Sequence, residues 1–311
     1  MKNFRRTIYP IFAMLVVALL SLVSVTYAWF TKGNVASVND LTLDVESSDG
    51  LLISLDGETW VSNLTGITFN GELTPLSTVG AMKTTGTGGI DIFSADYEDG
   101  LLKNIVEATK CTQSTDKGYY AMNLYFQNSS DKAMNVSLEG TGQESVATQV
   151  YDTVSNGRKY TRYSSLAARI GFLYRGSVLY TSAVSSITEM ATQPNTGNQS
   201  FTIFEPNATT HTLYANNYLT TQNQKESYYG LKKANTTTSL DPSVTTGANA
   251  EYFGAVTTKD TLTDTFFTIP AMSTICVTVY FWIEGQDVDC TNFVAGRQIF
   301  ADLKFIGTKV A

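Results

Sequence analysis

The chain is predicted to be all-β, an antiparallel β-sandwich or jelly roll. Short runs in which apolar and polar residues alternate recur along the 311 residues, and turn residues separate them. No stretch after residue 28 shows helical periodicity over about eleven residues. Many short alternating strands joined by turns are typical of two packed antiparallel sheets, each with one face toward the core.

The first strand is expected over residues 38–45, where four apolar residues nearly alternate with polar ones: Val38, Leu41, Leu43 and Val45. A second run over residues 51–55 meets Asp56-Gly57, which predicts a hairpin with a return at Trp60. The stretch Leu101–Ala108 is the one place where a minor helix is expected.

The centre of the chain predicts a hairpin. Tyr120, Met122, Leu124 and Phe126 share one face, a turn follows at residues 128–131, and a return strand then places three residues inward: Met134, Val136 and Leu138. Residues 166–174 predict another strand, which Arg175-Gly176-Ser177 turns back.

Two long runs close the sandwich. Over residues 274–283 the odd-numbered positions are expected to face the core, and residues 298–306 alternate in the same way. Residues 185–250 are rich in Thr, Asn, Gln and Ser and are interpreted as an insertion or as long loops. These loops are either a binding surface or a variable, solvated excursion.

The first thirty residues predict export. Basic residues near the start precede an uncharged apolar run over residues 8–25, and the small residue Ala28 follows. Either cleavage between Ala28 and Trp29 removes residues 1–28, or the segment stays as a membrane anchor. The body is then residues 29–311, located outside the cell or on its surface through the general secretory route. Membrane contact is expected only through this segment.

Composition fits an exported protein. Charged residues make up 16% of the chain, against about a quarter in an average globular protein. The net charge of -7 disfavours nucleic acid as a partner, because phosphate binding requires clustered Lys and Arg.

Two motifs carry a resemblance. Residues 26–31 read Thr-Tyr-Ala-Trp-Phe-Thr and lead into an alternating strand. They resemble the signal and mature start of exported Gram-positive proteins processed by a SipW-type signal peptidase, of which the TasA/camelysin biofilm-fibre proteins are the best-known branch. Residues 281–292 resemble a Trp-hydrophobe-Glu-Gly-x-Asp-x-Asp-Cys segment of uncharacterised exported clostridial proteins. The resemblance implies assembly into fibres or with other matrix proteins.

Catalytic motifs are scarce, so the chain is not expected to be an enzyme. Its one histidine, His211, stands in a Thr-rich stretch, and neither a nucleophile elbow nor a His-Glu-x-x-His zinc signature is present. A secreted hydrolase is the third and weakest hypothesis.

The best metal candidate is the acidic group Glu284, Asp287 and Asp289. Closely spaced carboxylates suit calcium, whereas the alternative is a solvated turn whose charges protect a sheet edge. No other cofactor is expected. Cys111, Cys276 and Cys290 allow one disulfide at most, and the spacing does not assign it.

The leading functional hypothesis is a secreted or cell-surface structural protein. After cleavage, the arm from Trp29 would lead into Val38, Leu41, Leu43 and Val45, which could add as a donor strand to the next subunit and build a fibre. The alternative is that this strand pairs within its own sheet. The second functional hypothesis is an adhesin that binds surface glycans through residues 185–250.

Overall fold

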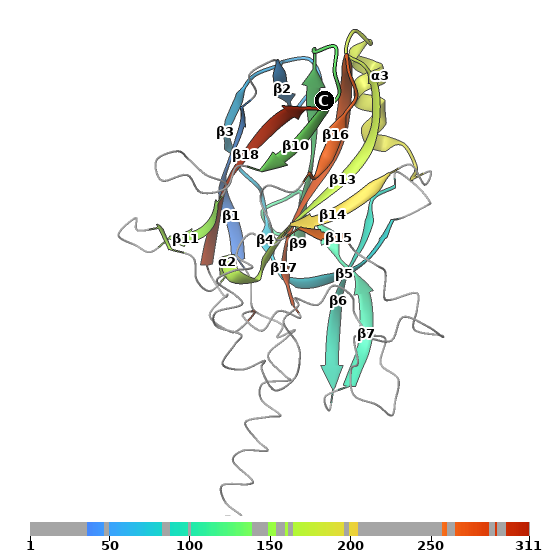
Figure 1. Ribbon diagram of the computed structural model, residues 1–311. Coiled ribbons are helices and arrows are strands. Elements are labelled where there is room, and N and C mark those ends of the chain that lie inside the picture. Colours follow the sequence, from blue (N-terminus) through green and yellow to red (C-terminus); the bar gives the residue numbers. More distant parts are fainter. Residues whose placement is uncertain are drawn as a thin grey trace, which may run out of the picture.

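The computed structural model describes residues 36–46, 50–82, 88–98, 101–138, 149–153, 159–160, 164–195, 199–204, 257–259, 265–285, 290 and 297–310. These residues form mostly β-strands in sheets that are largely antiparallel (Figure 1). The all-β class predicted from the alternating runs is therefore confirmed. The predicted signal segment, residues 1–28, lies outside the described residues.

The first sheet, called sheet A, is built around the last strand. It contains β1 (Ala36–Glu46), β3 (Asn63–Ile67), β4 (Glu72–Leu73), β10 (Met134–Leu138), β11 (Gln149–Thr153), β12 (Lys159–Tyr160), β16 (Phe267–Ile269) and β18 (Arg297–Lys309). One edge of β18 pairs with β1, and its other edge pairs first with β11 and then with β10. The short strand β8 (Thr109–Lys110) and β4 pair with the start of β9.

The second sheet, sheet B, is centred on β17. Its strands are β2 (Leu51–Ser54), β9 (Lys117–Asn128), β13 (Ala168–Leu179), β14 (Ser200–Phe204), β15 (Thr257–Lys259) and β17 (Ser273–Glu284). β17 lies between β13 and β9, and its end also pairs with β5 (Pro75–Met82). The short helix α2 (Ser164–Ala167) leads into β13.

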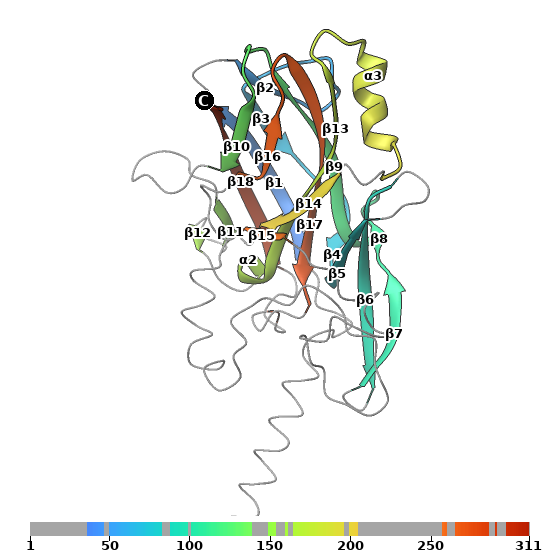
Figure 2. The same cartoon turned by 45° about the vertical axis from the view of Figure 1, so that its right-hand side comes forward.

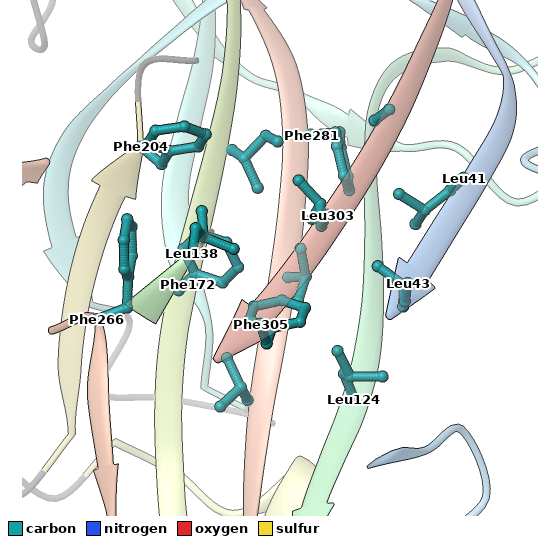
Figure 3. Close-up of a cluster of buried hydrophobic side chains, with 14 of the residues drawn as sticks. Leu41, Leu43, Leu124, Leu138, Phe172, Phe204, Phe266, Phe281, Leu303 and Phe305 are labelled. Atoms are coloured by element: carbon teal, nitrogen blue, oxygen red, sulfur yellow. The ribbon is translucent and has the colours of Figure 1, made fainter. Parts of the chain in front are cut away.

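Sheets A and B enclose the main core between them (Figure 3). Phe126 of sheet B lies with its ring centroid 5.0 Å from Phe305 and 4.9 Å from Phe267, both in sheet A. Phe172 makes an edge-on contact with Phe305 at 6.1 Å. The inward faces predicted for the two central strands and for the last strand are confirmed, since Leu124, Met134, Val136, Leu138, Ile299, Ala301 and Leu303 are all buried. The hairpin predicted between the two central strands was wrong. β9 pairs with β17 and β2 in sheet B, whereas β10 pairs with β16 and β18 in sheet A, so the turn at residues 128–131 connects the two sheets.

The prediction for residues 274–283 was incomplete, because β17 is buried at all twelve positions. Strands β5 and β6 (Ile90–Glu98) contribute to a hydrophobic cluster around Tyr280 and Trp282, on the face of sheet B that points away from the main core. Helix α3 (Val184–Glu189) and the turn η1 (Met190–Thr192) cover Cys276 on the same face. Sheet B therefore has no solvated face along its central strand.

The turn predicted at Arg175-Gly176-Ser177 was wrong. β13 runs on to Leu179, and its register against β17 shifts between Tyr174 and Gly176, where Gly176 has φ +149°. This β-bulge leaves Arg175 without a position in the ladder. Its guanidinium is buried, and Nη1 donates to Asn195 Oδ1 at 3.0 Å. The Asn195 amide in turn donates to the Gly89 carbonyl oxygen at 2.8 Å, which ties residues 88–89 to sheet B.

The minor helix predicted over residues 101–108 was also wrong. Leu101–Glu107 is strand β7, which pairs with β6 in an antiparallel ribbon. Figure 2 shows β6 and β7 extending beyond the two sheets. Within residues 185–250, α3, η1 and β14 pack on or join sheet B, and residues 205–250 lie outside the described residues.

The predicted Asp56-Gly57 hairpin is present as a wider loop. Ile53 and Val61 form an isolated antiparallel bridge, and the Asp56 carboxylate accepts backbone hydrogen bonds from Thr59 (2.7 Å) and Glu58 (2.8 Å). These bonds, first that from Thr59, hold the pKa of Asp56 well below its ordinary value of 3.8.

Asp56 is expected to make the loop acid-sensitive. Because its folded pKa is lowered, its stabilising effect is present above about pH 4 and declines as the pH falls toward the folded pKa. We expect Asp56→Ala to lower the melting temperature at pH 7 and to differ less from wild type at pH 2. Asp56→Asn is the matched neutral control. A difference between Asp56→Ala and wild type that is the same at both pH values would contradict this assignment.

Candidate functional site

The candidate site is strand β1, which contains the four residues predicted to form a donor strand. β1 runs parallel to β18 in a ladder from Ala36↔Arg297 to Glu46↔Ile306. Its other edge pairs antiparallel with β3, and Ala36 pairs with Leu73 of β4. The first described strand and the last one are thus neighbours in sheet A.

The side chains of β1 complete the main core. Val38 is 1% exposed, Leu41 and Leu43 are 0% exposed, and Val45 is 9% exposed. Figure 3 shows Leu41 and Leu43 pointing toward the group that contains Leu303 and Leu124. Without β1, β18 and β3 would each have an unpaired edge, and the core would be open to water along one side.

A bulge explains the irregular spacing of these residues. Val38 pairs with Ile299, but the next paired residue of β1 is Asp40, opposite Phe300. Asn39 is therefore the extra residue, and inward positions on either side of it are three residues apart instead of two. The step from Val38 to Leu41 in the sequence is the signature of this bulge.

The structure places the predicted donor strand within its own sheet. The position it fills has two backbone edges and an apolar floor, which is the arrangement that strand addition uses. The β1 strand of a second copy could form the same backbone hydrogen bonds with β18 and β3 and fill the same apolar positions of the core. The predicted cleavage point, Ala28 and Trp29, lies outside the described residues, as does His211.

Of the predicted acidic group, the structure describes only Glu284. Glu284 is the last residue of β17 and is 0% exposed, so for this residue the alternative of a solvated turn was wrong. Its Oε2 accepts a hydrogen bond from the indole nitrogen of Trp282 at 3.2 Å. Asp287 and Asp289 lie outside the described residues. Among the residues that are described, no three His, Cys, Asp or Glu side chains form a group able to hold a metal ion.

A chelator is expected to leave the melting temperature unchanged, because one of the three predicted calcium ligands is buried against Trp282. Thermal unfolding with and without EDTA, followed by addition of calcium, measures this. A lower melting temperature in EDTA that calcium restores would support the calcium site.

A buried arginine at this end of sheet B was not predicted. Arg169 is 0% exposed and pairs across the ladder with Trp282. Its Nη1 donates to the Ala168 carbonyl oxygen at 2.9 Å. An arginine at the polar position of an alternating strand is expected to face solvent. Arg169 is buried instead because the outer face of sheet B is covered by other parts of the chain.

No disulfide joins Cys111, Cys276 and Cys290, and all three are buried. Burial raises the pKa of Cys111 to about 11 and that of Cys276 to about 12, which disfavours the reactive thiolate.

We therefore expect the native protein to react slowly with Ellman's reagent at pH 8 and to release three thiols in denaturant. A reductant is expected to leave the melting temperature unchanged. Fewer than three thiols in non-reducing denaturant would instead indicate the disulfide that the sequence allows.

Comparison with family models, curated proteins and solved structures found no match to this chain. In the part of the chain that the structure describes, no helix is both long enough and apolar enough to cross a membrane.

Proposed function

We propose that this chain is a secreted or cell-surface structural protein, a biofilm-matrix or fibre subunit that assembles by strand addition of its N-terminal arm. The observation that carries the proposal is the position of β1. Its two edges pair with β18 and β3, and its apolar residues fill the core between the sheets. The β1 strand of another copy has the same sequence and can make the same contacts with β18 and β3.

The topology makes exchange of β1 easier than exchange of a central strand. β1 is the first described strand, so among the described strands its withdrawal strains one connection, the one toward β2. A central strand such as β17 would have to unthread connections at both ends. Exchange of a terminal element between identical subunits is a low-cost route to assembly, and one-way exchange builds an open chain.

Several parts of the proposal come from the sequence. They are the jelly-roll form of the sandwich, export through residues 1–28, cleavage between Ala28 and Trp29 by a SipW-type signal peptidase, and the absence of catalysis. No cofactor is proposed, and the alternative of calcium at Glu284, Asp287 and Asp289 is tested by the chelator experiment described above. Other matrix proteins are further proposed partners.

The test compares purified protein that begins at Trp29 with a variant lacking Trp29–Asp40. Negative-stain microscopy and light scattering are expected to show filaments or large oligomers for the first protein and none for the second. Deletion of residues 29–35 alone is the control, because it keeps all of β1. If polymers form without residues 29–40, the donor-strand mechanism is wrong.

A second variant keeps the core intact. Thr42 and Asp302 are paired, half-buried residues of β1 and β18, and Thr42→Cys with Asp302→Cys allows a disulfide between these strands. A disulfide within one chain keeps β1 in its own sheet, whereas a disulfide between two chains shows that β1 has been exchanged. A protein that stays monomeric and binds glycans on an array would favour the adhesin hypothesis instead.

A further inference from the structure

One end of the two-sheet body carries most of the exposed large apolar side chains among the described residues. Leu179 is 64% exposed, Val184 and Val310 are each 40% exposed, and Met272 is 38% exposed. We call these four residues the apolar end. Figure 1 shows this end with the C-terminus, the start of β10 and helix α3.

Backbone contacts place these residues at the same end. Leu179 pairs with Ser273, and the amide of Tyr180 donates to the Met272 carbonyl oxygen at 3.1 Å. Val184 opens α3 a few residues later. On the sheet A side, Val310 follows β18 and its amide donates to the Ala133 carbonyl oxygen at 2.8 Å.

Met272 has an unusual backbone. Its φ of +51° is the only positive value of a non-glycine residue in the described part of the chain. The left-handed region is unfavourable for a residue with a long side chain. Its amide donates to the Ser130 carbonyl oxygen at 2.9 Å, so the strained residue is held at the turn while its side chain stays partly in solvent.

The connection from β1 to β2 begins and ends at the apolar end. Glu46 pairs with Ile306, close to the end of β18, and Leu51 pairs with Asn128, which also pairs with Ser273 next to Met272. The chain from Glu46 to Leu51 has five peptide steps and therefore reaches at most about 18 Å. When β1 enters a second copy, β2 of the donor must stay within that distance of the acceptor's apolar end.

We propose that the apolar end is the surface through which copies joined by β1 contact each other, an inference that rests on the proposed strand exchange. The short connection brings like ends together. Reciprocal exchange then gives a closed pair, whereas one-way exchange gives a chain in which each apolar end contacts two neighbours. The occupant of this surface is a second copy of the same chain.

Two separate disulfide reporters in the protein that begins at Trp29 test the inference. Thr42→Cys with Asp302→Cys reports strand exchange, and Leu179→Cys alone reports contact between apolar ends. We expect both to give intermolecular bonds on non-reducing gels. Exchange without the Leu179→Cys bond overturns the inference and leaves the proposed function standing. The Leu179→Cys bond without exchange overturns the proposed function and with it the role of β1 at this surface. If neither reporter forms an intermolecular bond, both the inference and the proposed function are overturned.

A charge variant gives an independent measure. Leu179→Lys with Met272→Lys is expected to raise the concentration needed for assembly at least tenfold, because like charges would meet across the contact. The melting temperature of the monomer should be unchanged, since both side chains are exposed. Thr115→Lys, in the exposed turn before β9, is the control at the other end of that strand. Assembly within twofold of wild type for the charge variant would overturn the inference.

Discussion

Replacing Leu43 of β1 with aspartate is expected to abolish stable folding or to detach β1 from the core. Leu43 is 0% exposed and lies in sheet A between β18 and β3. A carboxyl at this position must either be protonated or be hydrated by water that enters the core. At pH 7, protonating a carboxyl with an ordinary pKa near 4 costs about 4 kcal/mol, at about 1.4 kcal/mol per pH unit.

Thr42→Asp is the matched control, because Thr42 is the next residue of the same strand and is only half-buried. It introduces the same charge outside the core, opposite Asp302 of β18, where repulsion between the two half-buried carboxylates costs up to about 1 kcal/mol. We expect Thr42→Asp to melt within a few degrees of wild type, and Leu43→Asp to show a low soluble yield and loss of near-UV circular dichroism. If the two variants melt alike, β1 does not contribute to the core as described.

Phe126→Ala is expected to destabilise the fold by about 3–5 kcal/mol, as large-to-small changes of buried aromatic residues do. Phe126 is 0% exposed, and its ring contacts Phe267 and Phe305 from the facing sheet. The cavity would lie between sheets A and B, where neither sheet can close it without shifting its strands.

Urea unfolding monitored by tryptophan fluorescence measures the change. Leu55→Ala, at a residue that is 43% exposed, removes a large apolar side chain from the surface and is expected to cost about 0.5 kcal/mol or less. A loss of less than about 1 kcal/mol for Phe126→Ala would mean that the two sheets do not pack through this residue.

The strands that could be predicted are those with one solvated face. In β10 the buried residues Met134 and Val136 flank half-buried Asn135, and alternation alone identifies the inward side. β17 carried a second signal: its apolar residues are almost continuous, which is typical of strands covered on both faces. Cys276, Tyr280 and Trp282 stand at its nominally outward positions and are buried by α3, β5 and β6.

The bulges show how local signals can mislead. Arg175-Gly176-Ser177 has the composition of a turn, but a glycine with positive φ also serves a bulge inside a strand. Only the pairing partner, β17, decides between them, and it lies far along the chain. For the candidate site, the burial of β1 followed from its pattern. Its parallel pairing with β18 did not, because no local feature of Ala36–Glu46 specifies a partner near residue 300.

The pairing of β1 with β18 also sets the order in which the chain can fold. Residues 36–46 are synthesised long before their partner strand, residues 297–309. Contacts with so large a sequence separation form slowly, and unpaired apolar strands are prone to pair with other chains while they wait. Until β18 has been synthesised, only the edge of β1 that faces β3 has its partner strand in the same chain. Pairing of β1 within its own molecule therefore competes with pairing in a neighbouring molecule, and a higher local protein concentration favours the second outcome.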